Sequence, residues 1–158
     1  MKTIKQSNLL DEPVDALIYS TNVLLNLTGG VGAQLLERFG TSLQTSLHNQ
    51  LRAQGKRFAT RGDVIELVLP SMPWKIVFHT IPCDPMYHTT PEIVARTLRR
   101  CFDRCLERGD IASVATSAIA TGYGDMVMED FISIFDDVTG DARYAGRLDI
   151  RLCLPLDE

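Results

Sequence analysis

The sequence predicts an α/β domain of three layers, an α/β/α sandwich with a mixed central sheet. Short apolar runs alternate with longer segments of helical periodicity, which is the pattern of strands covered by helices. Two of the runs, residues 14–19 and 111–119, contain few charged side chains, as strands buried on both faces of a parallel sheet do. Residues 63–69 and 74–81 are strands joined by a short Pro-containing connection, which predicts a hairpin and makes the sheet mixed.

The N-terminal half supplies two helices besides these strands. Residues 33–39 follow a glycine-rich loop and end at Gly40, and glycine is the common residue just beyond a helix. Thr41 and Ser42 suit the start of the next helix, which Gly55 ends. Weak alternation also indicates a first strand, and residues 7–13 read as a loop. The expected elements of this half are strands at 2–6, 14–19, 63–69 and 74–81, and helices at 33–39 and 41–54.

The C-terminal half begins with the most regular helix, residues 91–108. Pro91 and Glu92 suit its first turn, because proline needs no N–H there and a carboxylate answers the helix dipole. Its apolar residues recur at helical spacing on one face. A strand at 111–119, a helix at 126–138 and a strictly alternating strand at 147–154 follow. Glu129 and Asp130 suit acid–base work or, as we favour, the dipole of the helix that they open.

Arginine is frequent on the helix at 91–108. Five arginines suit either a nucleic-acid surface or a solvated face. The solvated face is favoured, because Asp103 and Glu107 lie among them and the formal net charge of the chain is −4. The arginines are Arg96, Arg99, Arg100, Arg104 and Arg108.

The composition, the net charge and the cysteine spacing of the whole chain limit the classes of protein to which it can belong. We expect one domain over residues 1–158, because no repeat, low-complexity tract or linker divides the chain. Neither a membrane-spanning run nor the apolar core of a signal peptide is visible, so we expect a cytoplasmic protein without a membrane partner. The net charge makes nucleic acid an unexpected partner. No cysteine falls in C-x-x-C, so reduced core cysteines are expected, with no metal site and no cofactor.

Two glycine-bearing loops each follow a buried strand and precede a helix. The first has Thr28-Gly29-Gly30-Val31-Gly32, and the second has residues 120–125, reading ATGYGD. Unpaired N–H groups and the dipole at a helix N-terminus favour anions, although such a loop can also be a mere connector. Neither G-x-G-x-x-G nor a Gly-Lys-Ser/Thr motif is present. Two facing loops are suited to hold both ends of a diphosphate.

These residues resemble a macro domain, the ADP-ribose-binding module. The family has a strand close to D-A-I-V-N-A-A-N, a G-G-G-V loop and a later strand that runs into P-A-I-x-T-G. Here the corresponding residues are 15–22 (DALIYSTN), 29–31 (GGV) and 117–122 (SAIATG). The resemblance covers nearly the whole chain, but only the two loops are specific.

The resemblance implies a role for each matching position. Asn8, before Leu9, takes the place of an aspartate that accepts from the adenine amino group. Asn22 takes the place of an asparagine at the distal ribose, where it would position ribose and water in any catalysis. Residues 29–32 and 118–124 would approach the diphosphate from its two sides, with Tyr123 on the distal ribose. The implied ligand-binding residues are Asn8, Leu9, Asn22, Gly29, Gly30, Val31, Gly32, Ala118, Ile119, Ala120, Thr121, Gly122, Tyr123 and Gly124.

Three departures from the family pattern concern catalysis. Gly32 stands where one hydrolase subgroup has an aspartate that helps to activate water, Tyr19 replaces an asparagine, and Asp125 replaces a glycine or aromatic residue. His79 lies on a buried strand, which favours a satisfied core histidine over a catalyst. His88 lies in the loop 82–90, whose role the sequence leaves open.

Three functions follow from the resemblance. The first is binding of ADP-ribose or of ADP-ribosylated protein. The second is hydrolysis of mono-ADP-ribosyl groups on protein, or deacetylation of O-acetyl-ADP-ribose. The third is binding of RNA or poly(A) in the same cleft, which the net charge disfavours. Gly32 favours the first function over the second.

Overall fold

The computed structural model describes residues 1–156 and is built on a six-stranded sheet with the order β1-β6-β5-β2-β4-β3. The strands β1, β6, β5, β2 and β4 run parallel to their neighbours, and β3 pairs with β4 antiparallel. The mixed sheet is therefore confirmed, with the hairpin where the sequence predicts it. The strands are β1 (Lys2–Gln6), β2 (Ala16–Ser20), β3 (Val64–Glu66), β4 (Ile76–Thr80), β5 (Ser113–Thr116) and β6 (Asp149–Leu154).

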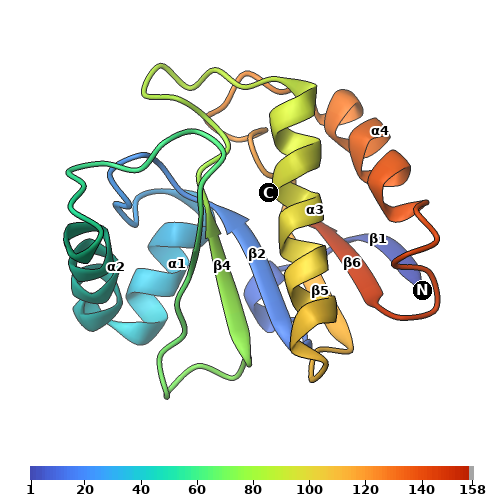
Figure 1. Cartoon of the computed structure of the whole chain (residues 1–158), viewed down its shortest axis with the longest axis horizontal. Helices are drawn as coiled ribbons and strands as arrows, with labels where there is room; N and C mark the ends of the chain where they lie inside the picture. Colours follow the sequence, from blue (N-terminus) through green and yellow to red (C-terminus); the bar gives the residue numbers. More distant parts are fainter. Residues whose placement is uncertain (157–158) are drawn as a thin grey trace.

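Helices cover both faces of this sheet, which confirms the three layers (Figure 1). The pair α3 and α4 covers one face, and the pair α1 and α2 covers the other. The helices are α1 (Gly30–Phe39), α2 (Thr41–Ala53), α3 (Pro91–Arg108) and α4 (Met128–Thr139), and a short 3-10 helix, η1, spans Leu9–Asp11.

The core follows from the alternation of side chains along β2. Leu17 and Tyr19 pack with leucines of α1 and α2, whereas Ile18 packs with aromatic residues of α3 and α4. All three side chains have no exposed surface. Because both faces of β2 are covered, the strand is apolar on both sides, as its sequence predicts.

The strand predicted at residues 2–6 has those bounds, whereas the other five are shorter than predicted, and β3 gives the clearest physical reason. The sequence predicts a strand over residues 63–69, but β3 ends at Glu66. The next carbonyl, that of Leu67, accepts a hydrogen bond of 2.8 Å from Nε2 of His79. Leu67 N–H still donates to the carbonyl of Val77 in β4 at 3.2 Å, so the buried side chain replaces only the return bond to the Leu67 carbonyl.

Two helical boundaries differ in a way that matters for the site. The helix expected at 33–39 begins at Gly30, so the glycines form its first turn rather than a loop before it. Residues 7–13, expected as a loop, contain η1, which Asn8 caps. The helix predicted at 91–108 has those bounds, and the one predicted at 126–138 is Met128–Thr139.

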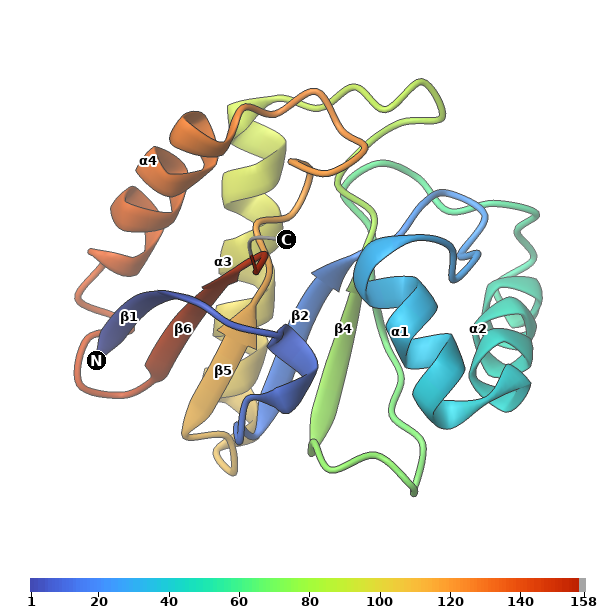
Figure 2. The same ribbon diagram turned by 180° about the vertical axis from the view of Figure 1, so that it is seen from behind.

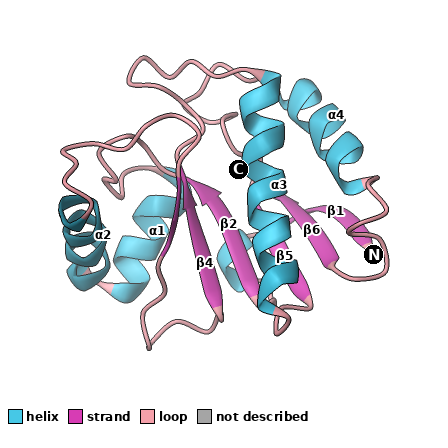
Figure 3. Ribbon diagram, viewed as in Figure 1, coloured by secondary structure: helices cyan, strands magenta, loops and turns pink. Residues whose placement is uncertain are grey.

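Several long loops collect at the carboxyl ends of β2 and β4, whereas the connection between β3 and β4 lies at the opposite edge of the sheet (Figure 3). Parallel strands of an α/β sheet commonly bind ligands at this edge. None of the helices within residues 1–156 has the length and apolar character needed to cross a bilayer. The single domain expected over 1–158 includes two residues, 157 and 158, that lie outside the described part of the chain.

Candidate ligand-binding cleft

A cleft of about 990 Å³ lies at the carboxyl ends of β2 and β5. The start of α1 and the loop after β5 border it, and both lie near the carboxyl end of β2 (Figure 2). Most of the residues implied by the family resemblance meet here although they are far apart in the sequence. Those that line the cleft are Asn8, Leu9, Asn22, Gly29, Gly30, Val31, Ala118, Ala120, Thr121, Gly122, Tyr123 and Gly124.

Gly32 and Ile119 are the two implied residues that do not line the cleft. Ile119 has no exposed surface, because its side chain belongs to the core under α3 and α4. Gly32 is buried in α1, where an added Cβ would lie 3.4 Å from Cα of Leu27. The sequence shows the glycine pattern but not which side of the helix each glycine faces.

The first glycine loop presents backbone donors to the cleft. Gly29 precedes α1 with φ of 63°, a left-handed conformation that suits glycine, and no side chain caps the helix there. Free N–H groups in a first helical turn, together with the helix dipole, favour a phosphate or another anion. The short residues Gly29 and Gly30 leave this backbone open to a ligand.

The two loops approach each other at Gly29 and Tyr123. A Cβ placed on Gly29 would collide with the phenol ring of Tyr123. Gly124 is equally restricted, because a Cβ there would collide with the carbonyl of Ala120 and with Sγ of Cys83. Glycine at these two positions lets the loops close on opposite sides of one cleft.

Asn22 lines the cleft and also folds the loop that follows β2. Its Oδ1 accepts from the backbone N–H of Leu24 at 3.2 Å and of Asn26 at 3.1 Å, and its Nδ2 donates to the carbonyl of Asn26 at 2.9 Å. The side chain therefore fixes the path of the chain toward Gly29, in addition to the ribose-positioning role that the resemblance implies.

Gln44 of α2 is a supporting residue that the sequence analysis missed. Its Oε1 accepts from Leu27 N–H at 2.7 Å, and its Nε2 donates to the carbonyl of Leu25 at 2.5 Å. Leu25 has φ of 55°, which is uncommon for a residue with a side chain. Gln44 thus satisfies the backbone of a strained turn, and no local sequence pattern links it to that turn.

The adenine base that is expected to contact Asn8 would lie near two side-chain amides, those of Asn8 and Gln34. Asn8 Oδ1, expected to accept from the ligand, accepts from the backbone N–H of Leu10 at 3.1 Å, which uses one of its two lone pairs. Asn8 Nδ2 donates to Oε1 of Gln34 at 3.1 Å, and Gln34 also lines the cleft. Gln34 is a second cleft residue that the sequence analysis missed, because its partner lies 26 residues away.

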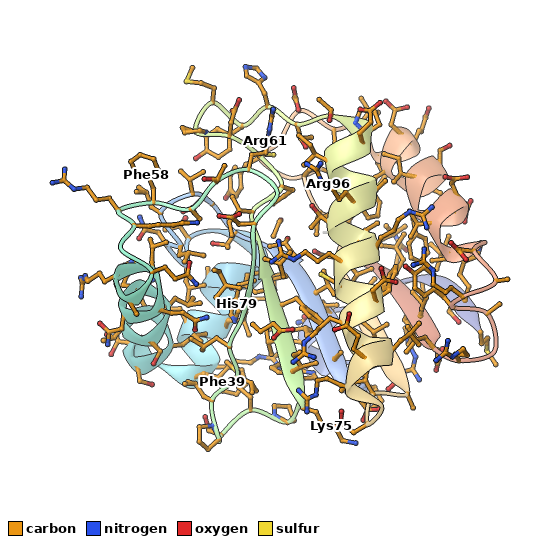
Figure 4. The ribbon with its side chains drawn as sticks, in the orientation of Figure 1. Phe39, Phe58, Arg61, Lys75, His79 and Arg96 are labelled. Carbon is orange, nitrogen blue, oxygen red and sulfur yellow. The ribbon has the colours of Figure 1, made fainter. Side chains whose placement is uncertain are left out.

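His79 is a core histidine, as the sequence analysis favoured. It lies on the side of β4 that faces α1 and α2 (Figure 4) and has no exposed surface. Its Nδ1 accepts from the hydroxyl of Tyr19 at 2.5 Å, while Nε2 donates to Leu67. Burial lowers the pKa of His79 to about 4 and raises the pKa of Tyr19. Neither residue lines the cleft.

His88 lies outside the cleft and joins the loop 82–90 to the loop after β5. Its Nδ1 lies 3.1 Å from Oδ2 of Asp125, whose Oδ1 accepts from the N–H of Thr89 at 3.0 Å. The hydrogen bond from His88, followed by that from Thr89, lowers the pKa of Asp125. The position that departs from the family pattern, Asp125, therefore ties the loop 82–90 to the loop after β5.

Among the described residues, Asp84 is the carboxylate that lines the cleft. Its Oδ1 accepts from the N–H groups of His88 and Met86, and these bonds lower its pKa. Arg61 approaches from the neighbouring loop, with Nη1 3.8 Å from Oδ2 of Asp84 (Figure 4). A carboxylate stabilised in this way is a weak base. Within residues 1–156, no three His, Cys, Asp or Glu side chains converge as metal ligands.

Solved structures of low sequence identity share this fold. The macrodomain of Thermus aquaticus DarG is 17% identical, with a TM-score of 0.78 over 98% of this chain and 99% of that chain. A mutant macrodomain of Oceanobacillus iheyensis with ADPR is 16% identical, with a TM-score of 0.83 over 98% and 84% of the two chains. The Trypanosoma brucei macrodomain in complex with ADP is 18% identical, with a TM-score of 0.78 over 99% and 64%.

Sequence comparison assigns the family. No curated protein matches the chain. The family model for the macro domain, however, matches residues 18–135, which is more than half of the chain and includes both glycine loops. The chain therefore belongs to the macro domain family.

Proposed function

We propose that the cleft binds ADP-ribose, either free or attached to a protein. The observation that carries the proposal is the convergence of two glycine-bearing loops on one cleft, with an uncapped helix N-terminus on one side. The net charge is −4, so local backbone dipoles rather than a basic face would hold the diphosphate. Relatives of the same fold solved with ADPR or ADP support this assignment.

The geometry favours binding over hydrolysis. Hydrolysis needs a group that positions or deprotonates water near the distal ribose. Gly32 has no side chain for this role, Asp84 is a weak base, and His79 is enclosed in the core. Three hydrogen bonds of Asn22 are made within its own loop, and the second N–H of its Nδ2 can donate to a ligand but cannot act as a base. For the second function, ADP-ribosyl hydrolysis, the bases that remain are a phosphate oxygen of the ligand and, among residues 1–156, His88, which lies outside the cleft.

Calorimetric titration tests the binding proposal. We expect ADP-ribose to bind with a measurable enthalpy, and AMP and ribose 5-phosphate, which each contain one end of it, to bind more weakly. Because ADP-ribose would contact both glycine loops, AMP and ribose 5-phosphate would each lose the contacts with one loop. Folded protein that binds none of the three at millimolar concentration would refute the proposal.

A further inference from the structure

The orientation of two side-chain amides is fixed at one end of the cleft. A backbone N–H only donates, so the bond from Leu10 N–H requires that Asn8 turn its oxygen toward Leu10. Asn8 Nδ2 then faces Gln34 and donates to its Oε1 at 3.1 Å, so the oxygen of Gln34 must point toward Asn8. This leaves Nε2 of Gln34 with no protein acceptor among residues 1–156. Both amides thus offer remaining N–H groups at this end of the cleft.

Apolar residues border these amides on one side. Because β1 pairs with β6, the segments that follow Gln6 and Leu154 lie side by side where they leave the sheet. Ser7 N–H donates to the carbonyl of Leu154 at 3.1 Å. Leu9, Pro155 and Leu156 accordingly line the cleft beside Asn8. An apolar wall with a polar edge suits a flat heterocycle such as a purine.

We propose that this end takes the purine base and presents hydrogen-bond donors to its C6 edge, with Gln34 as a specificity-determining residue. A 6-oxopurine offers an accepting oxygen there, whereas adenine offers an amino group that donates. The site therefore accepts a hypoxanthine nucleoside diphosphate ribose at least as well as ADP-ribose. This inference rests on the proposed binding of ADP-ribose in the cleft, and it concerns which base that site selects.

An aspartate or glutamate at this pair would reverse the preference. In Gln34→Glu, one carboxylate oxygen still accepts from Asn8 Nδ2, and the other replaces the donating amide group with an acceptor. In Asn8→Asp, the carboxylate still accepts from Leu10 N–H, so the cap of η1 is kept, and Gln34 can turn its N–H groups toward it. Each variant then presents an acceptor that favours the amino group of adenine.

The experiment measures the ratio of dissociation constants for ADP-ribose and for its hypoxanthine analogue by calorimetry. In the native chain we expect the analogue to bind equally or up to about fivefold more tightly, as one neutral hydrogen bond allows. Gln34→Glu and Asn8→Asp should shift the ratio about tenfold toward ADP-ribose. Gln54→Glu, at the exposed end of α2, adds the same charge away from the cleft and should leave the ratio unchanged.

The outcomes separate this inference from the proposed function. Tight ADP-ribose binding with an analogue at least tenfold weaker would overturn the inference and leave the proposed function standing. Equal ratios in the native chain and in both variants would do the same, because they would place the base away from Asn8 and Gln34. If folded native protein binds neither ligand, both the inference and the proposed function fail.

Discussion

His79 and Tyr19 form a buried polar pair that the sequence does not reveal as a pair. They lie on adjacent positions of β4 and β2, where the register places Tyr19 opposite His79. Every polar atom of the two side chains has a partner, since the histidine donates to Leu67 and accepts from the tyrosine. Such a satisfied pair has a structural role, and its cost is seen only when the imidazole is protonated.

Stability against acid should therefore depend on His79. The pKa of His79 is about 4 in the folded protein, against an ordinary value of 6.5. Between these pH values His79 is therefore protonated in the unfolded chain and neutral in the folded protein. The free energy of unfolding should fall by about 3 kcal/mol from this residue as the pH falls from 7 to 4. His79→Gln should remove this part of the pH dependence.

Urea unfolding at pH 4, 5, 6 and 7 checks this prediction. The difference between native protein and His79→Gln isolates the histidine from the carboxylates that titrate in the same range. Parallel stability curves for the two proteins would contradict the assignment of a neutral, buried His79.

Gly30 tests the first glycine loop at the level of one residue. A Cβ at this position would meet no atom within 4 Å, so Gly30→Glu should fold, with some loss of stability because φ is 50°. We expect ADP-ribose affinity to fall at least about 100-fold, because a carboxylate would lie where the phosphates approach. Gly30→Ala, with the same backbone strain and no charge, is the matched control in the titration. Equal affinities for the two variants would show that the loop is only a connector.

Asn22 tests whether any catalysis depends on positioning. We expect hydrolysis of mono-ADP-ribosylated protein to be weak or absent, and any turnover to fall at least about tenfold in Asn22→Ala, because the loop toward Gly29 loses three hydrogen bonds. Any turnover should be unchanged in His79→Gln, since His79 does not line the cleft. A single-turnover assay measures both. Fast turnover that is unaffected by Asn22→Ala would direct attention to His88 and the loop 82–90.

The loop 82–90 is an element whose role emerges only from the structure. Asp84 accepts from two backbone N–H groups within this loop, and Asp125 accepts from Thr89 N–H and lies against His88. The rings of Tyr87 and Tyr123, one from each loop, have centroids 6.4 Å apart. The loop is therefore fastened to the loop after β5, and it forms part of the cleft border.

Asp125→Ala should loosen this border without unfolding the domain. It removes the acceptor of Thr89 N–H and the partner of His88, both at exposed positions. We expect faster amide exchange across the loop 82–90, an unchanged exchange rate in α3, and ADP-ribose affinity lower by about three- to tenfold. Hydrogen exchange with mass spectrometry and titration measure these effects. Exchange in the loop that equals that of native protein would show that its own hydrogen bonds hold it.

Elements of this chain differ in how far sequence reasoning reaches them. The helix at 91–108 can be predicted to the residue because Pro91, Thr90 and Gly109 mark its ends locally, and Thr90 accepts from Ile93 N–H as a cap does. The shortened β3 cannot, since it ends where a distant side chain takes the Leu67 carbonyl. The amide pair of Asn8 and Gln34 escapes prediction for the same reason. These features depend on contacts between segments that are distant in the sequence, and the local periodicity of apolar residues does not predict such contacts.

The molecule as a whole follows the topology that buried strands and two glycine loops predict. The parallel order of β6, β5, β2 and β4 brings the carboxyl ends of β2 and β5 together, and with them two loops that are about 90 residues apart in the chain. The sequence therefore predicts the place of the cleft. It does not predict the support of the loop before α1, which comes from Gln44 of α2, or the place of Gln34 of α1 in the cleft lining.

Ligand binding should raise the stability of the whole domain. A ligand that binds only the folded state adds about 2.7 kcal/mol when its concentration is 100 times the dissociation constant. For a domain of this size that corresponds to roughly 5–11 °C in melting temperature. Differential scanning fluorimetry with ADP-ribose should show this shift in native protein and not in Gly30→Glu at the same ligand concentration. A shift of equal size in both proteins would mean that the ligand binds away from the glycine loops, and the cleft would lose its assigned role.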